Sequence, residues 1–418
     1  MTTTYPELLA RLYAARRAGV VLGLERITAL LARLDHPERR LGTVVHVGGT
    51  NGKGSTVAMV AAVARAAGRR VGVYTSPHLA SLRERFTVDG ALASEDAVGS
   101  AAERVAAAGG DELTFFEQVT AIGLVVLADA EPDLTVLEVG LGGRLDATNA
   151  VPAPIAAVTG VALDHQQFLG DTLRAIAGEK AGIWKPGQYA IIGAAGEAEA
   201  LPWLALAAWS AGVSEVRIVE PDARSPATAL LGAHQRANAA CADALVDALV
   251  ARGALVAPAE VRAAGYAQVV HPGRLDEVVP GLLLDGAHNP HGAAALAAYV
   301  ATRPERPKVL VVAVSADKDV DGILAPLVPR FDAVIATRYD QARALEPAAL
   351  AARARAAGAL CETAPDLTDA VDRARAAVGR GGLVVVAGSL FAIGEVRPRF
   401  APMAIDPIRL SDPSTPAT

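Results

Sequence analysis

The stretch V-V-H-V-G-G-T-N-G-K-G-S-T at residues 44–56 joins an apolar run to a glycine-rich turn, and a helix-like segment A-M-V-A-A-V-A-R-A-A-G follows it. Strand, turn and helix in this order predict a phosphate-binding loop. Glycines let backbone N–H groups point at phosphate oxygens, and the helix begins with its positive end. Lys53 can bridge the terminal phosphates while Ser55 or Thr56 holds magnesium. We therefore expect ATP and Mg²⁺ at this loop.

The loop departs from the common pattern at one position. Gly54 stands between Lys53 and Ser55, where the hydroxyl usually follows the lysine directly. A glycine turn that binds no ligand is the alternative interpretation. The strand before the turn and the helix after it favour the nucleotide site.

Length, composition and charge limit the class of protein. A chain of 418 residues can form two or three domains with apolar cores. With 52% hydrophobic and 20% charged residues, most of the chain cannot be disordered. The formal net charge of −6 argues against a nucleic-acid surface, although a local basic pocket would be hidden in that sum. The expected partners are small molecules.

Cysteines and terminal segments give no sign of export. Cys241 and Cys361 lie far apart without metal-ligand spacing, so neither a disulfide framework nor a structural zinc site is supported. No apolar stretch approaches the length of a membrane span, and the start M-T-T-T-Y-P-E lacks the blocks of a signal peptide. We expect a cytoplasmic monomer that uses neither nucleic acid nor membrane.

Apolar runs alternate with alanine-rich segments of helical period, which predicts an α/β protein with mostly parallel sheets. A break rich in proline and glycine around Pro272 divides this alternation, so we expect a phosphate-loop domain over residues 1–272 and a smaller domain over residues 273–402. The proline-rich residues 403–418 are expected to be frayed. The predicted strands cover residues 43–47, 70–75, 134–139, 155–161, 189–192, 282–285, 308–314, 333–337 and 383–387.

Three polar clusters follow predicted strands of the first domain. Glu138 ends one strand, Asp164 and His165 follow a second, and Ser76 and His78 follow a third. Open α/β sheets bind ligands at this carboxyl edge. Oxygen ligands suit magnesium, whereas imidazole is an unusual choice. A hydrogen-bonded loop histidine and a solvated or capping glutamate remain the alternatives for each cluster taken singly.

A set of motifs in a fixed order resembles the folylpolyglutamate synthase and dihydrofolate synthase family, part of the wider Mur ligase group. The resemblance covers nearly the whole chain. It implies a phosphate-loop domain of the Mur ligase central type followed by a Rossmann-like domain. The motifs are G-T-N-G-K-G-S-T, Y-T-S-P-H-L with R-E-R-F, T-F-F-E, L-E-V-G-L-G-G-R-L-D-A-T-N, L-D-H-Q-Q-F-L-G-D-T-L, G-E-K-A-G-I, H-Q-R-A-N-A-A, P-G-R-L and L-D-G-A-H-N-P.

The resemblance also implies a set of ATP contacts. The phosphate loop would surround the ATP phosphates, an asparagine would contact adenine, and an arginine and an aspartate of the linker and second domain would contact phosphate and ribose. His288 and Asn289 would line the same cleft, although His288 taken alone is more simply a turn residue. The implied residues are Asn51, Gly52, Lys53, Gly54 and Ser55 for the phosphates and metal, Asn238 for adenine, and Arg274 and Asp285 for phosphate and ribose.

For the metal, the resemblance implies Ser76, Glu138 and His165 as ligands, with Ser55 beside the ion. It further implies that Lys180, in E-K-A-G-I, is carbamylated and becomes an additional carboxylate-like ligand. Carbamylation needs a neutral amine, so Lys180 should be buried with a lowered pKa. An ion pair with a nearby acid such as Glu179 is the alternative. Lys53, Glu138, His165 and Lys180 form the expected catalytic set.

The activity implied is an ATP-dependent amide ligation. A substrate carboxylate attacks the γ-phosphorus of ATP to form an acyl phosphate, and the amine of L-glutamate then displaces phosphate. Magnesium, Lys53 and Arg274 would neutralise the phosphoryl charge, and a cleft between two domains would exclude water. The proline- and glycine-rich break around Pro272 motivates the hypothesis that the two domains move closer together when ATP binds.

Two acceptors are possible within the family: dihydropteroate, which receives the first glutamate, and tetrahydrofolate with its polyglutamates. The segments Thr114, Phe115, Phe116 and Glu117 and Leu145, Asp146 and Ala147 match the pteroate-contacting segments of bifunctional members. We therefore favour a bifunctional enzyme over one that only extends tails.

Two departures from the family pattern stand beside this match. Val21 occupies a position where bifunctional members can have an acid. The stretch between Gly193 and Leu231 is short and lacks strands that relatives carry before H-Q-x-x-N. The second departure bears on the edge of the first domain rather than on its chemistry.

Two rival functions are less consistent with the sequence. A cell-wall ligase of the Mur group needs a nucleotide-sugar domain of roughly a hundred residues ahead of the phosphate loop, but here the loop begins by Gly48. A non-catalytic ATP-binding module would keep Lys53 but would have no reason to keep Glu138, His165, Lys180 and Asp285 in separate segments.

Overall fold

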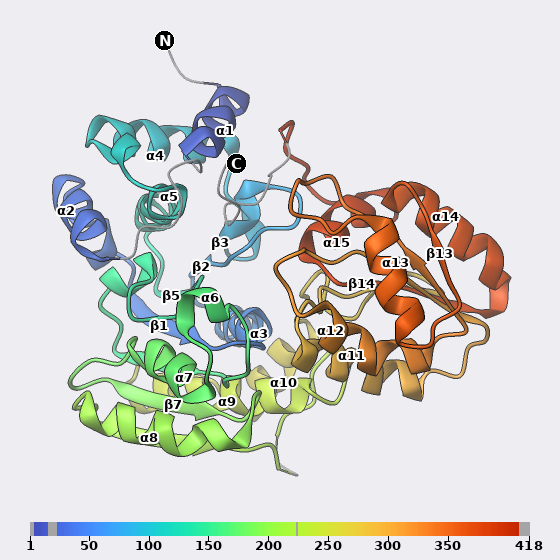
Figure 1. Ribbon diagram of the computed structural model, residues 1–418. Helices are drawn as coiled ribbons and strands as arrows, with labels where there is room; N and C mark the ends of the chain where they lie inside the picture. The colour runs from blue at the N-terminus through green and yellow to red at the C-terminus, as the bar shows by residue number, and fades with distance from the viewer. Residues whose placement is uncertain (1–3, 16–22, 223–224, 409–418) are drawn as a thin grey trace.

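Two separate sheets organise the chain, and they lie side by side in the computed structural model (Figure 1). The structure describes residues 4–15, 23–222 and 225–408. We call the part built on the first sheet the first domain and the part built on the second sheet the second domain. The α10 helix, Ala259–Ala267, is the last element before the linker, and the β9 strand, Asp276–Val279, is the first element after it.

The first sheet has eight strands in the order β4-β3-β2-β5-β1-β6-β7-β8. All neighbouring pairs are parallel except those that involve β3 and β4, which form an antiparallel edge. The strands are β1 Thr43–Gly48, β2 Val71–Tyr74, β3 Phe86–Val88, β4 Ala91–Leu92, β5 Leu134–Glu138, β6 Ile155–Val158, β7 Tyr189–Gly193 and β8 Glu215–Val219.

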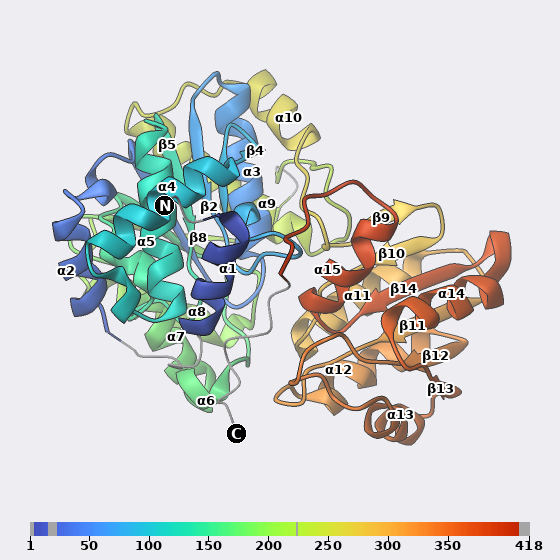
Figure 2. The same ribbon diagram turned by 90° about the horizontal axis from the view of Figure 1, so that it is seen from above.

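Helices cover both faces of this sheet (Figures 1 and 2). The helices α3, α9 and α10 bury their apolar residues with one face of the central strands. On the other face α1, α2, α4 and α5 pack over β2, β3 and β5, while α7 and α8 pack over β6 and β7. The helices are α1 Tyr5–Ala14, α2 Glu25–Arg33, α3 Lys53–Ala66, α4 Glu95–Ala107, α5 Phe115–Asp129, α6 Gln166–Leu169, α7 Leu173–Ala181, α8 Leu201–Ser210 and α9 Gln235–Ala251.

The second sheet has six strands in the order β13-β12-β11-β14-β10-β9, and only the β9–β10 pair is antiparallel. The helices α11, α12 and α13 share one buried cluster with this sheet, and α14 and α15 share the other. The remaining elements are β10 Leu282–Leu284, α11 Pro290–Thr302, β11 Lys308–Val312, α12 Val320–Leu327, β12 Ala333–Ala336, α13 Pro347–Ala356, β13 Cys361–Thr363, α14 Leu367–Val378, β14 Leu383–Ala387 and α15 Leu390–Val396.

The expected α/β architecture with two mostly parallel sheets is confirmed, and every predicted strand is present. The sequence missed five strands, namely β3, β4, β8, β9 and β13. They lie at or next to sheet edges and are short or partly exposed, so they lack the apolar runs of the central strands. The stretch between Gly193 and Leu231 contains one strand, β8, which pairs with β7. That relatives carry further strands there stays a prediction.

Parallel pairing brings four chain segments to one edge of the first sheet. The strands β1, β2, β5 and β6 all run in the same direction. The loops that follow Gly48, Tyr74, Glu138 and Val158 therefore meet at their carboxyl ends, where open α/β sheets place their ligands. Among the residues described, none of the helices combines the length and apolar character that a membrane crossing requires.

The end of the described chain returns to the first domain, which corrects the expectation that fraying starts at residue 403. The Asp406 carboxylate is buried and accepts hydrogen bonds from the Tyr5 hydroxyl at 3.0 Å, the Ser81 hydroxyl at 2.7 Å and the Leu82 N–H at 2.7 Å. Proline-rich composition suggested a free tail, but one acid with three donors is enough to fix the segment. The predicted fraying of residues 409–418 lies outside the described residues.

Replacing Asp406 with alanine should destabilise the first domain by about 2–4 kcal/mol, because three buried donors would lose a charged acceptor. Urea unfolding followed by tryptophan fluorescence measures this, since all three tryptophans lie in the first domain. Asp129 of the first domain is a matched control, because its side chain is about half exposed and pairs with Arg104. Asp129→Ala should change stability by no more than about 0.5 kcal/mol. Equal effects for the two variants would contradict the anchoring role of Asp406.

Candidate active site

A cleft of about 290 Å³ lies between the two domains, and loops of both domains line it. The residues that the resemblance assigned to ATP, metal or catalysis border this one cleft, whereas Thr56 and Asn289 are not among its lining residues. The bordering residues are Asn51, Gly52, Lys53, Gly54, Ser55, Ser76, Glu138, His165, Lys180, Asn238, Arg274, Asp285 and His288. They come from widely separated segments, so the fold itself brings them together.

The phosphate loop, residues 48–55, depends on glycine for its close packing. Gly49 and Gly52 have φ angles of +140° and +84°, which residues with side chains rarely adopt. A side chain at Gly49 would begin 2.0 Å from Thr159 Oγ1, and one at Gly52 would begin 2.1 Å from Asn238 Oδ1. The end of β6 and the α9 helix therefore approach the loop backbone directly.

The unusual Gly54 has a steric cause. A side chain at this position would begin 2.6 Å from Nε2 of His271, a residue of the linker between the domains. The histidine ring occupies the space that a serine directly after Lys53 would need, and the hydroxyl moves one position to Ser55. The linker thus packs against the first turn of α3, next to the site where phosphates are expected.

Two lysines converge on the same carbonyl of the phosphate loop. Lys53 Nζ donates to the carbonyl oxygens of Gly49 at 2.9 Å and Thr50 at 3.0 Å, and Lys180 Nζ donates to Gly49 at 3.1 Å. Desolvation lowers the pKa of both amines, and the nearby Lys53 charge further lowers the pKa of Lys180, to about 7. The expected lowering of the Lys180 pKa is confirmed.

The alternative for Lys180, an ion pair with Glu179, is not formed. Glu179 instead lies 3.3 Å from Arg144 Nε. Lys180 is 4% exposed, and only a backbone carbonyl accepts a hydrogen bond from its amine among the described residues. A substantial neutral fraction of this amine is therefore present near neutral pH.

Glu138 and Ser76 form the carboxylate and hydroxyl pair expected for a metal. The Glu138 side chain is buried and accepts a hydrogen bond from Ser76 N at 3.2 Å, and desolvation raises its pKa while Lys53 opposes the rise. Ser76 Oγ is buried without a hydrogen-bond partner among the described residues. A buried hydroxyl without a partner beside a buried carboxylate fits a hard cation such as Mg²⁺.

His165 does not complete a metal site built from protein side chains alone. Its side chain is 37% exposed, and its Nε2 is 3.8 Å from Asp164 Oδ1. In the described part of the chain, no group of three His, Cys, Asp or Glu side chains could hold a metal ion alone. That arrangement suits magnesium, which keeps waters and takes substrate phosphates alongside one or two carboxylates.

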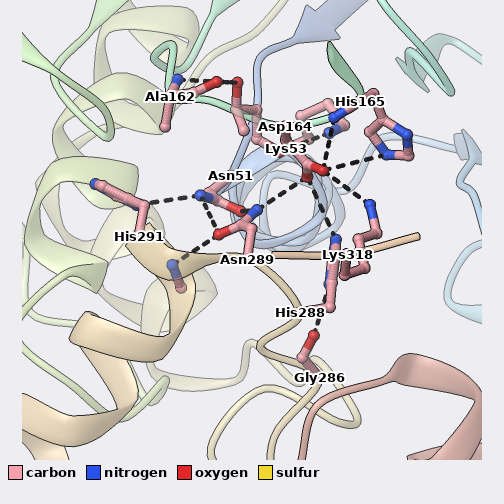
Figure 3. Close-up of polar contacts among 12 residues, drawn as sticks. Asn51, Lys53, Ala162, Asp164, His165, Gly286, His288, Asn289, His291 and Lys318 are labelled. Atoms are coloured by element: carbon pink, nitrogen blue, oxygen red, sulfur yellow. Dashed lines mark hydrogen bonds and ion pairs between the residues drawn. The ribbon is translucent and has the colours of Figure 1, made fainter. Parts of the chain in front are cut away.

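Asp164 of the first domain contacts residues of the second domain (Figure 3). Its carboxylate accepts hydrogen bonds from Asn289 Nδ2 at 2.9 Å and Lys318 Nζ at 2.8 Å, both from the second domain, and His288 Nε2 lies 3.6 Å away. Asn289 also exchanges hydrogen bonds with Asn51 of the phosphate loop. Although burial opposes ionisation, the surrounding histidines and Lys318 hold the pKa of Asp164 far below its usual range.

The second domain contributes a cation and an acid to the cleft. Arg274 borders the cleft, and no ion pair with an acid is formed by its guanidinium within the described ranges. The Asp285 carboxylate accepts hydrogen bonds from the N–H groups of Leu275 and Ala287 at 2.8 and 2.9 Å. The His288 ring contacts the Gly286 carbonyl at 2.8 Å, which agrees with a turn residue that also faces the cleft.

The α9 helix supplies the residue expected to contact adenine. Asn238 donates to Gln235 Oε1 at 2.8 Å, while its own Oδ1 is buried without a hydrogen-bond partner among the described residues. Gln235 donates to Ser55 Oγ at 3.3 Å. An unsatisfied amide oxygen of this kind can accept a hydrogen bond from an amino group of a ligand.

The segments predicted for pteroate do not border the cleft, and several of their polar groups already have structural partners. Thr114 and Glu117 form a capping box at the start of α5, and Glu117 also pairs with Arg26 at 2.8 Å. Asp146 accepts hydrogen bonds from Gly140, Leu141 and Thr148. Phe115 and Ala147 are buried, whereas Phe116 and Leu145 are half-buried and offer apolar surface. Val21 lies outside the described residues.

Sequence reasoning missed three residues of the site. Lys318 follows β11 in S-A-D-K-D, and its charge at a strand end was the available signal. Gln235 lies three residues before Asn238 on the same face of α9, a spacing that helical geometry could have revealed. His271 could not be found from pattern, because only the folded linker brings it against the phosphate loop.

Comparison with known proteins agrees with this arrangement. The family described as Mur ligase, glutamate ligase domain, matches residues 273–390. A dihydrofolate synthase/folylpolyglutamate synthase of Mycobacterium tuberculosis is 36% identical, with 90% of each chain covered. A protein of the same name from Bacillus subtilis is 31% identical over 96% of this chain and 100% of its own length.

Solved structures give the same result. The M. tuberculosis folylpolyglutamate synthase with ADP and AMPPCP is 35% identical with a TM-score of 0.84, covering 90% of this chain and 95% of its own. The E. coli FolC structure in complex with DHPP and ADP is 31% identical with a TM-score of 0.85, covering 94% and 99%. The chain therefore belongs to the dihydrofolate synthase/folylpolyglutamate synthase family.

Proposed function

We infer that the chain is an ATP-dependent ligase that joins L-glutamate to the carboxylate of dihydropteroate, of tetrahydrofolate and its polyglutamates, or of both. One observation carries this conclusion: the phosphate loop, two buried lysines, the Glu138–Ser76 pair and the second-domain residues Arg274 and Asp285 border one cleft. Relatives are solved with ATP analogues, and one structure holds Mn, AMPPNP and L-glutamate.

The residues of the cleft fit ATP and Mg²⁺. The backbone N–H groups at the start of α3 would face the ATP phosphates, and Lys53 and Arg274, which border the cleft, would be the cations that neutralise the phosphate charge. Asn238 Oδ1 is the acceptor proposed for adenine, and Asp285 the contact proposed for ribose. Ser55, Ser76, Glu138 and His165 would hold Mg²⁺, which withdraws charge from the phosphoryl oxygens when bound.

The residues of the chain then perform distinct tasks. Lys53 and Arg274 stabilise charge on the γ-phosphoryl group while the acceptor carboxylate attacks phosphorus and ADP leaves. The closed cleft between the domains keeps water from the acyl phosphate. The amine of glutamate attacks the acyl carbon, and phosphate departs with one oxygen of the original carboxylate. A free carboxylate would lack such a leaving group.

We also propose that Lys180 is carbamylated. Its buried amine, with a pKa near 7, is neutral often enough to react with carbon dioxide, and the product carries a negative charge. That charge would lie beside Lys53, which also donates to the Gly49 carbonyl. Carbamylation thus replaces a repulsive pair of amines with an attractive pair and adds an oxygen ligand for metal.

For the acceptor, a bifunctional enzyme remains our proposal. The half-buried Phe116 and Leu145 supply the apolar surface that a pterin and its benzoate ring require. The capping box at Thr114 and Glu117 fixes the start of α5, so these two residues would shape the pteroate site rather than bind the ligand directly. The cytoplasmic location, the monomeric state and the division at residues 272 and 273 also stay predictions.

The acceptor assignment predicts phosphate release from Mg²⁺ and ATP that depends on glutamate and on either dihydropteroate or tetrahydrofolate. Lys53→Ala should lower this rate by at least about 100-fold, because one cation at the transferred phosphoryl group is lost. A colorimetric phosphate assay compares the two acceptors. Release with tetrahydrofolate alone would reduce the enzyme to tail extension, and release with neither would contradict the proposed function.

The carbamylation of Lys180 predicts a carbamate carbon resonance when the protein is incubated with ¹³C-bicarbonate. The signal should be strong at pH 8 and weak at pH 6, because an amine with a pKa of about 7 is roughly nine-tenths neutral at the first pH and one-tenth at the second. Lys180→Arg should abolish it, since arginine stays protonated. Lys185→Arg is the control variant and should keep the signal. A resonance that survives Lys180→Arg would place the carbamate elsewhere.

Domain closure should depend on the contact between Lys318 and Asp164. Small-angle scattering of the wild type is expected to show a smaller radius of gyration with AMPPNP, Mg²⁺ and acceptor than without them. Lys318→Met should reduce the change, because it removes the cation that joins the domains at 2.8 Å. Asp317→Asn is a control, since Asp317 pairs with Arg343 inside the second domain. Ligands that leave the wild-type profile unchanged would count against closure.

A further inference from the structure

Arg85 is a buried cation whose hydrogen-bonding groups are only partly satisfied by the described residues. It ends the short 3₁₀ helix Leu82–Arg85, and its side chain is 3% exposed. Its Nε donates to His78 Nδ1 at 2.9 Å, and its guanidinium carbon lies 5.8 Å from the centre of the Phe115 ring. Its Nη1 is buried without a hydrogen-bond partner among the described residues, and none of their acids forms an ion pair with it.

The contact with His78 does not compensate the charge. Arginine can only donate, so His78 Nδ1 must be the acceptor, and an imidazole that accepts at this nitrogen is neutral. The Phe115 ring attracts the cation but carries no net charge. Removing a guanidinium from water is costly unless an anion is paired with it. A buried guanidinium without a paired anion is therefore best explained as the binding site for an anionic group of a ligand.

The position of Arg85 narrows the identity of that anion. The Arg85 carbonyl accepts a hydrogen bond from Thr75 N at 3.1 Å, next to the metal-ligand candidate Ser76. On its other side is Phe115, the first residue of α5, in the segment that matches pteroate-contacting segments of the family. Arg85 thus lies between the place proposed for metal and phosphates and the place proposed for pteroate.

Electrostatics connect Arg85 to the same reaction centre. Desolvation raises the pKa of Glu138, and Arg85 is one of the cations that oppose this rise, after Lys53 and Arg274. Unlike those two cations, Arg85 does not border the ATP cleft. Its charge therefore acts on Glu138 although its guanidinium lies over Phe115 outside that cleft.

We propose that Arg85 binds the carboxylate of the acceptor and holds it for attack on the γ-phosphorus. This inference rests on the proposed function, because only a carboxylate acceptor supplies this anion. A planar guanidinium matches a carboxylate in shape and donor geometry, which a lysine does not. The acceptor's aromatic body would lie toward Phe115, and its carboxylate would then point to the phosphate loop.

The test is a comparison of two ligands on two proteins. Equilibrium binding of pteroate and of its carboxamide, which lacks the negative charge, is measured with ADP and Mg²⁺ present. The wild type should prefer pteroate by roughly 30-fold or more, the usual effect of removing one partner from a buried charge pair. In Arg85→Met this preference should fall to within about 3-fold, because the carboxylate has lost its partner.

Controls separate this role from a loss of structure. Arg83 lies on the same 3₁₀ helix and faces Glu95 at 3.6 Å, so Arg83→Met should keep the wild-type preference. ADP affinity reports whether each variant is folded. Should Arg85→Met fail to bind ADP, Arg85→Lys decides: a preference reduced by at least about 3-fold supports the proposal, because lysine lacks the planar fork.

The outcomes are distinct. A preference that is unchanged in the folded Arg85 variants, or absent from the wild type, overturns the role of Arg85 while leaving the ligase function intact. Wild-type protein that binds ADP but neither pteroate nor tetrahydrofolate overturns the proposed function and this inference with it.

Discussion

The close approach of neighbouring residues to three glycines of the phosphate loop is the constraint on which the site depends. Gly49, Gly52 and Gly54 lie so close to Thr159, Asn238 and His271, respectively, that a Cβ atom on each glycine would collide with its neighbour. Three different elements, the end of β6, the α9 helix and the interdomain linker, therefore fix the loop from three sides. The backbone N–H groups are held in place before phosphate arrives, which is the preorganisation that phosphoryl transfer requires.

Around this loop the cleft is rich in cations although the chain carries a formal charge of −6. Lys53, Lys180, Arg274 and Lys318 lie in or at the cleft, and three largely buried acids, Glu138, Asp164 and Asp285, line it with them. Desolvation lowers the pKa values of Lys53 and Lys180 and raises that of Glu138. Burying these charged groups without ligands raises the free energy of the folded protein, whereas a polyanionic nucleotide and a metal ion would compensate their charges. The cleft is therefore less stable without ligands than an apolar core would be, and this favours ligand binding.

The two domains are joined by more than the linker. Asp164 accepts hydrogen bonds from Asn289 and Lys318 of the second domain (Figure 3). The segment that ends at residue 408 returns to the first domain through Asp406. The first contact lies beside the phosphate loop and the second beside the loop that carries Ser76. Any movement of one domain relative to the other must therefore change the contacts beside the phosphate loop and beside the loop that carries Ser76.

The sequence was sufficient for the central strands and the nucleotide cleft because both depend on local signals. Apolar runs report central strands, and polar residues directly after them, such as Glu138 and Ser76, fall at one sheet edge by parallel topology. Edge strands such as β8 were missed because none of the β8 residues is fully buried, so the strand lacks the apolar run of a central strand. His271 and Asp406 could not be assigned from pattern, since each acts across a long sequence separation that only the fold closes.

The most direct test of the mechanism is the fate of the acceptor's carboxylate oxygen. Acceptor labelled with ¹⁸O in that carboxylate is converted with ATP, Mg²⁺ and L-glutamate, and the phosphate released is examined by mass spectrometry. An acyl phosphate requires one labelled oxygen in each phosphate, because the attacking oxygen leaves with phosphorus when the amide forms. Phosphate without label would contradict the central claim that this cleft activates a carboxylate by phosphorylation.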